Sequence, residues 1–117
     1  MKWQQAIRQH FPKHKYAIQA AYLGDTSALP WSNLGYWSDA VGSDYPAACQ
    51  NLAAHLAAAV HLNSKDVVLD LGCGQGASLK YWLEHYQIQR LEAVELQDHH
   101  VQSIRQHLNS NITIHAA

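Results

Sequence analysis

The sequence contains one run from which its fold can be worked out: Val67-Val68-Leu69-Asp70-Leu71-Gly72-Cys73-Gly74-Gln75-Gly76. The first five residues are mostly apolar and do not alternate with polar ones, which is typical of a strand buried on both faces of a parallel sheet. The next five form a glycine-rich turn, and apolar residues at helical spacing follow over 77–86. A strand, a turn and a helix in this order predict the beginning of an α/β unit.

The same pattern continues after this unit. A second strand is predicted over 91–96 and a third over 112–115, with an amphipathic helix over 98–108 between them. Strands that are separated by helices imply a parallel sheet with right-handed connections. We therefore expect an α/β fold with a layer of three parallel strands.

The residues before the first strand have a different composition. Helical spacing of apolar residues predicts helices within 1–23 and over 46–60. The segment 24–44 is rich in turn formers but also carries Tyr36 and Trp37, which either anchor it to the core or line a site.

A polar break at Asn63-Ser64-Lys65-Asp66 divides the chain into two parts. Residues 1–64 are predicted to form a helical cover with an aromatic loop. Residues 65–117 are predicted to form the α/β part.

Composition and charge argue against several classes of protein. The chain has 117 residues, of which 48% are hydrophobic and 15% are charged, and its net charge is −1, as expected of a globular domain. It has no cluster of Lys and Arg for binding nucleic acid and no apolar run long enough to span a membrane. Cys49, Cys73 and the nine histidines show no zinc-type spacing, so we expect no metal site. No signal peptide is expected either, and we expect a cytoplasmic protein.

The glycine turn is suited to hold a cofactor that contains a nucleoside. Glycines after a strand let the backbone approach a ligand closely. Glu95 ends the second predicted strand, where its carboxylate can accept hydrogen bonds from ribose hydroxyls. Two patterns fit these residues. The dinucleotide pattern G-x-G-x-x-G/A is satisfied by Gly72, Gly74 and Ala77. The pattern D-x-G-x-G-x-G is satisfied by Asp70, Gly72, Gly74 and Gly76.

The second pattern resembles the first motif of the class I S-adenosylmethionine-dependent methyltransferases, and Ala93-Val94-Glu95 is similar to the acid on their second strand. The resemblance covers 65–117 and extends to the enzymes that methylate small molecules. It implies a Rossmann-like sheet of strand order 3-2-1-4-5-7-6, of which this chain would supply only strands 3-2-1, preceded by N-terminal helices. It also implies S-adenosyl-L-methionine as the cofactor and a truncated, N-terminal part of the domain. An acid beside the turn suits the cationic groups of this cofactor, whereas it would repel a pyrophosphate.

The resemblance assigns roles to the residues of the motif. It implies that the cofactor is bound by Gly72, Gly74 and Gly76 along its methionine and ribose parts, by Asp70 at its amino-acid end, by Glu95 at its ribose hydroxyls and by Leu96 at its adenine face. Cys73 lies inside the motif, so the resemblance also places it among the cofactor-binding residues, with its side chain interpreted as a small apolar filler. No catalytic residue is indicated.

A second likeness concerns Asn33-Leu34-Gly35-Tyr36-Trp37. This stretch is similar to one that precedes the core domain in some small-molecule methyltransferases. It implies that Tyr36 and Trp37 fold over the cofactor or the substrate, where an aromatic ring would attract the sulfonium. The alternative is that both rings pack the N-terminal helices onto the sheet.

The function that the sequence favours is methyl transfer to a small-molecule acceptor, without a complete active site in this chain. A fragment of an NAD-dependent oxidoreductase and a non-catalytic, self-associating remnant are the alternatives. The strand 67–71 would lie at a sheet edge with unpaired backbone groups and bare apolar faces. We therefore expect that a second copy of the chain covers this edge.

Overall fold

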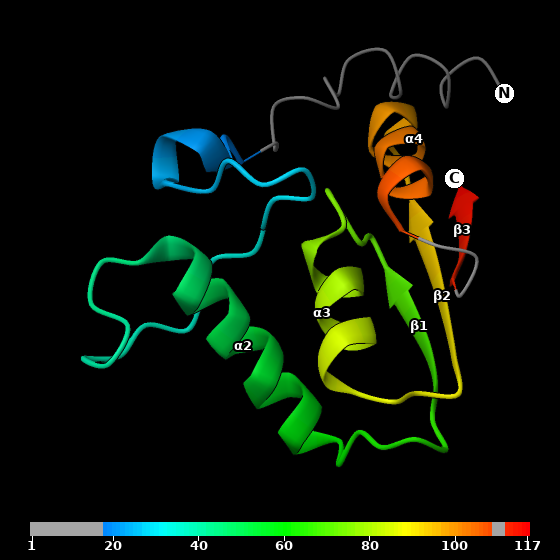
Figure 1. Ribbon diagram of the computed structural model, residues 1–117, viewed down its shortest axis with the longest axis horizontal. Helices are drawn as coiled ribbons and strands as arrows, with labels where there is room; N and C mark the ends of the chain where they lie inside the picture. The colour runs from blue at the N-terminus through cyan, green and yellow to red at the C-terminus, as the bar shows by residue number, and fades with distance from the viewer. Residues whose placement is uncertain (1–17, 109–111) are drawn as a thin grey trace, which may run out of the picture.

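The computed structural model describes residues 18–108 and 112–117 (Figure 1). Of the helices predicted within 1–23, the part over 1–17 lies outside these residues, and the described remainder forms only a short 3-10 helix rather than the end of an α-helix. The described elements are a short 3-10 helix (Ala20–Leu23), α2 (Tyr45–Ala59), β1 (Val67–Leu71), α3 (Ala77–His85), β2 (Arg90–Glu95), α4 (Asp98–His107) and β3 (Ile112–Ala116).

The three strands form one parallel sheet in the order β1-β2-β3. In the register, Leu69 lies beside Glu92, and Glu92 lies beside Thr113. The helices α3 and α4 make the two crossover connections (Figure 1). The predicted α/β class and the parallel layer are therefore confirmed, and the strand order corresponds to strands 3-2-1 of the expected sheet.

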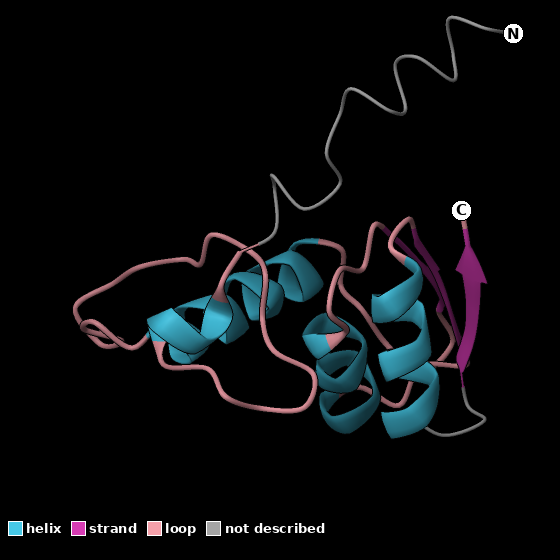
Figure 2. Cartoon of the chain, turned by 90° about the horizontal axis from the view of Figure 1, so that it is seen from above, coloured by secondary structure: helices cyan, strands magenta, loops and turns pink. Residues whose placement is uncertain are grey.

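The main core lies between the sheet and the two crossover helices, which pack on the same face (Figure 2). Its fully buried side chains come from both layers and include Leu79, Leu91, Val101 and Ile104. The opposite face of the sheet carries no helix among the described residues (Figure 2).

The prediction that the first strand is buried on both faces is wrong for the described residues. Its side chains alternate, so Val68 and Asp70 point to the helices, whereas Val67, Leu69 and Leu71 are 52%, 56% and 72% exposed. β1 lies at the edge of the sheet with bare apolar side chains, as expected from its place in the fold.

The helix α2 begins and packs for reasons visible in the sequence. The Asp44 side chain caps it by accepting a hydrogen bond from the Ala47 amide at 3.1 Å, and a proline stands in its first turn. Its small residues, such as Ala48 and Cys49, are buried. Among the described helices, none is long and apolar enough to span a bilayer.

Candidate functional site

The glycine turn connects β1 to α3 in a conformation that suits glycine. Gly72, Gly74 and Gly76 have φ angles of 71°, 61° and 99°, in the left-handed region that other residues rarely adopt. A β-carbon at Gly76 would stand 2.7 Å from Ile104 Cγ1, so this glycine also allows α4 to approach. The amides of Gly72 and Cys73 both donate to the Val94 carbonyl, at 2.8 and 3.2 Å, and this anchors the turn to the end of β2.

Glu95, at the end of β2, is joined directly to this turn. Its side chain is 6% exposed, and Oε2 accepts a hydrogen bond from the Gly74 amide at 2.6 Å. Its other oxygen, Oε1, accepts from the amides of Leu96 at 2.8 Å and Gln97 at 3.0 Å. The structure thus brings together the acid and the turn that the sequence predicts as partners.

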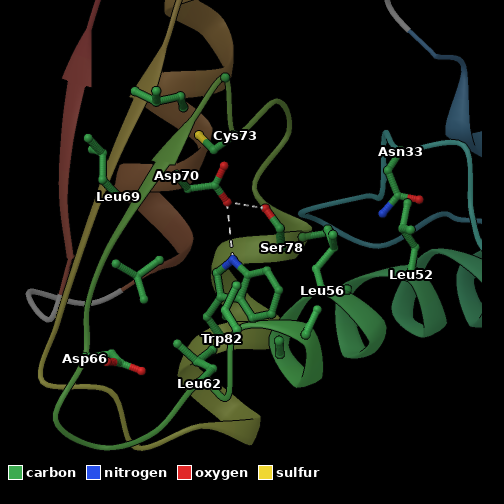
Figure 3. Close-up of a pocket in the computed structure, with 18 of the residues that line it drawn as sticks. Asn33, Leu52, Leu56, Leu62, Asp66, Leu69, Asp70, Cys73, Ser78 and Trp82 are labelled. Atoms are coloured by element: carbon green, nitrogen blue, oxygen red, sulfur yellow. Dashed lines mark hydrogen bonds between the residues drawn. The ribbon is translucent and has the colours of Figure 1, made fainter.

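Asp70 points from the inner face of β1 toward the first turns of α3. Its Oδ2 accepts hydrogen bonds from Ser78 Oγ at 2.9 Å and from Trp82 Nε1 at 3.3 Å (Figure 3). The sequence alone does not predict these two donors, because Trp82 falls among the apolar residues at helical spacing over 77–86. The signal that could have found them is their spacing of one helical turn at the start of α3.

A cleft of about 690 Å³ lies between α2 and β1. Its walls are mainly apolar, with Leu52 and Leu56 on one side and the β1 strand on the other (Figure 3). Asp70, Gly72 and Cys73 line its end at the glycine turn. The cleft therefore combines apolar walls with one carboxylate, and at its end a ligand could come close to the backbone of the glycine turn.

The loop before α2 contributes Ser32 and Asn33 to this cleft. A β-carbon at Gly74 would stand 2.5 Å from Ser32 Oγ, so the loop lies directly against the glycine turn. The Asn33 side chain holds the loop in place, because it donates to the Cys49 carbonyl at 3.2 Å and accepts from the Gly35 amide at 2.7 Å.

Tyr36 and Trp37 are not brought to the glycine turn. The Tyr36 ring packs at a tilt of 41° against His55 of α2, with the centroids 4.1 Å apart, and Trp37 Nε1 donates to the Leu34 carbonyl at 2.9 Å. Both side chains are about half exposed, and neither lines the cleft. Their role toward a cofactor stays a prediction.

The remaining predicted site residues are Leu96 and Cys73. Leu96 is 51% exposed at the end of β2, so its side chain has an open face toward solvent. Cys73 is buried, and burial, followed by the charges of Asp70 and Glu95, raises the pKa of its thiol to about 12. A thiol with such a pKa stays neutral and is a poor nucleophile, which agrees with a filler role.

Within 18–108 and 112–117, no three side chains of His, Cys, Asp or Glu come together in a way that could hold a metal ion.

The parallel strands, the glycine turn and the acid at the end of β2 define a class I S-adenosylmethionine-dependent methyltransferase domain, whose cofactor is S-adenosylmethionine. No family profile matches the chain. It is, however, 35% identical over 88 residues to erythromycin 3''-O-methyltransferase of Saccharopolyspora erythraea. The aligned part is 75% of this chain and 26% of that enzyme. The chain belongs to the class I methyltransferase family.

Solved structures of several proteins share this fold. Geranyl diphosphate methyltransferase, in complex with geranyl diphosphate and sinefungin, has a TM-score of 0.69 at 17% identity, over 98% of this chain and 48% of that one. Coclaurine N-methyltransferase, bound to N-methylheliamine and S-adenosylhomocysteine, has a TM-score of 0.57 at 20% identity, over 97% of this chain and 37% of that one. The [4+2]-cyclase SpnF has a TM-score of 0.61 at 19% identity, over 71% of this chain and 32% of that one. At these identities the likeness concerns the fold alone.

Proposed function

We propose that the glycine turn and the carboxyl ends of β1 and β2 hold S-adenosylmethionine, and that the protein transfers its methyl group to a small molecule. The observation that carries this proposal is the hydrogen bond of the Glu95 carboxylate to the Gly74 amide. It joins the acid at the end of β2 to the glycine turn that follows the neighbouring strand β1, where the ribose of a nucleoside would bind.

The roles we propose follow from where these groups lie. Asp70 faces the amino-acid end of the cofactor, because its carboxylate stands in the cleft beside the turn. Glu95 accepts from the ribose hydroxyls, since each carboxylate oxygen can accept more than one hydrogen bond. The exposed Leu96 packs on the adenine, and Tyr36 and Trp37 close over the bound molecule after a rearrangement of their loop.

The methyl transfer itself is proposed for the whole protein. A lone pair of the acceptor forms the bond to the methyl carbon, and the carbon–sulfur bond breaks with its electrons going to sulfur. The chain spans about a quarter of the curated relative (26%). We therefore propose that it is the N-terminal part of such an enzyme, with 1–64 as the cover, 65–117 as the first half of the cofactor domain, and no complete acceptor site.

A small-molecule acceptor is supported in two ways. The name of the curated relative refers to a small molecule, erythromycin. The names of two structures with the same fold also refer to small molecules, geranyl diphosphate and coclaurine. The net charge of −1 offers no basic surface for a nucleic acid. A cytoplasmic location is supported by Cys49 and Cys73, which are both free and buried.

The bare edge of β1 supports a second proposal, that two copies of this chain associate through it. The Gly72 amide bonds to β2, so by alternation the backbone groups of Val67, Leu69 and Leu71 point to the open edge. Their side chains add an exposed apolar stripe. An antiparallel pairing about Leu69 would match this edge with itself and bring the two apolar stripes side by side on one face of the joined sheet.

Binding of S-adenosylhomocysteine by the 117-residue chain tests the proposed function. We expect this product to raise the melting temperature, because a ligand at a hundred times its Kd stabilises a folded protein by about 2.7 kcal/mol. We expect no shift with NAD, since the Asp70 carboxylate beside the turn would repel a pyrophosphate. Stabilisation by NAD alone would instead favour an oxidoreductase, and stabilisation by neither ligand in a dimeric chain would favour the self-associating remnant.

A further inference from the structure

We infer that Ser78 and Trp82 are positioning residues, which hold the Asp70 carboxylate where it can receive the ammonium group of the cofactor. This inference rests on the proposed function and deepens it. It assigns two side chains of α3 to the recognition of the amino-acid end of the ligand.

The geometry of the three residues carries the inference. Ser78 Oγ and Trp82 Nε1 lie one helical turn apart and donate to the same atom, Asp70 Oδ2, at 2.9 and 3.3 Å (Figure 3). Neither of these two donors occupies Oδ1. All three residues line the 690 Å³ cleft. The two donors of α3 thus hold Oδ2 of the carboxylate, so that Oδ1 can accept a hydrogen bond from a ligand group in the cleft.

The donors are themselves fixed. The Trp82 indole packs against the main core, and its ring centroid lies 5.4 Å from that of Tyr81 and 6.0 Å from that of Tyr86. Ser78 stands in the first turn of α3, directly after the glycine turn. A donor whose rotamer is locked by packing gives a precise orientation to the group it binds.

The fixed orientation of the Asp70 carboxylate matters because the amino-acid end of the ligand carries a positively charged ammonium group. An ammonium is recognised best by a carboxylate whose orientation is fixed before binding, because less side-chain entropy is then lost. Since an ionised carboxylate accepts from two neutral donors here, it keeps its full charge for the cation. Fixing Asp70 therefore favours ligands that carry an amino group over nucleosides that lack one.

The same two hydrogen bonds could serve only to hold α3 against β1. Binding measurements with two different ligands distinguish this structural role from the positioning of Asp70. S-adenosylhomocysteine carries the amino-acid part, whereas 5′-methylthioadenosine has the same nucleoside without it. A positioning role concerns only the first ligand. Damage to the fold would weaken the binding of both.

We expect the double variant Ser78→Ala, Trp82→Phe to bind S-adenosylhomocysteine about tenfold more weakly in calorimetric titration, because the loss of two hydrogen bonds to a charged group removes its orientation. The Kd of 5′-methylthioadenosine should change by less than about twofold. Tyr86→Phe is the control for a disturbed aromatic cluster, since it removes only the hydroxyl of a ring that lies 6.0 Å from Trp82, and it should leave both Kd values unchanged.

A second arm tests whether Trp82 acts through Asp70. Trp82→Phe should weaken S-adenosylhomocysteine binding in the parent chain and have no further effect in an Asp70→Asn background, because the two changes share one interaction. Trp82→Phe alone keeps an aromatic ring in the cluster, so it replaces the double variant in this test if the double variant does not fold. Equal weakening of both ligands, or no weakening of either, would overturn the inference. If neither ligand binds the parent chain, the proposed function is wrong and the inference falls with it.

Discussion

Replacing Glu95 by Gln is expected to weaken S-adenosylhomocysteine binding about a hundredfold. The two carboxylate oxygens accept hydrogen bonds from three backbone amides, those of Gly74, Leu96 and Gln97. A glutamine has a single acceptor oxygen, so its NH₂ group must face either the turn or the end of β2. At the same time the ribose hydroxyls lose a charged acceptor. Hydrogen bonds to charged groups contribute about 1.5–3 kcal/mol each, and the loss of two of them at the lower end of this range corresponds to about two orders of magnitude in Kd.

The matched control is Glu92→Gln on the same strand. Glu92 points to the bare face of the sheet, where it pairs with Arg90 at 3.2 Å and with His115 at 3.1 Å. Its ion pair with the exposed Arg90 and its hydrogen bond with His115 should contribute little to stability and nothing to the ligand. Isothermal titration of both variants should show a change only for Glu95. An unchanged Kd in the folded Glu95→Gln variant would mean that Glu95 holds the turn but not the ribose.

Replacing Leu69 by Lys is expected to convert a dimer of this chain into a monomer. Leu69 is 56% exposed at the centre of β1, so its loss should cost the monomer little. In the proposed antiparallel pairing, Leu69 stands opposite its own counterpart, and Val67 stands opposite Leu71 of the other copy. Two lysines at the central position would repel each other, and charged residues at a sheet edge oppose pairing in general.

Light scattering on the parent chain and its variants measures this directly. Thr113→Lys is the control, because Thr113 is exposed on β3, at the other edge of the same sheet. The control should remain a dimer. A parent chain that is monomeric, or a dimer that only Thr113→Lys breaks, would rule out association through β1.

Much of the site could be predicted because its connections are local. Gly72 to Gly76 follow β1 directly, and Glu95 ends β2. Neighbouring parallel strands end at the same edge of a sheet, so sequence order alone places the acid beside the turn. The hydrogen bond from the Gly74 amide to Glu95 shows how close the two come.

What the sequence could not predict depends on packing between distant segments. The hydrogen bond of Trp82 to Asp70 depends on the angle at which α3 packs on β1, which the sequence does not specify. A tryptophan at helical spacing is more simply predicted to be a core residue. The contact of the Tyr36 ring with His55 depends on the path of a loop rather than on its composition. The exposure of Leu69 depends on what covers the second face of the sheet, which the apolar character of the strand does not specify.

Amide chemical-shift mapping with S-adenosylhomocysteine tests the central claim, that the cofactor binds at the glycine turn. Binding must alter the surroundings of the Gly72 and Gly74 amides, and of the Leu96 amide that bonds to Glu95. We predict the largest shifts at these three amides, with small shifts along the bare face of the sheet. Saturation with the ligand that leaves the Gly74 and Leu96 amides unmoved would contradict the claim.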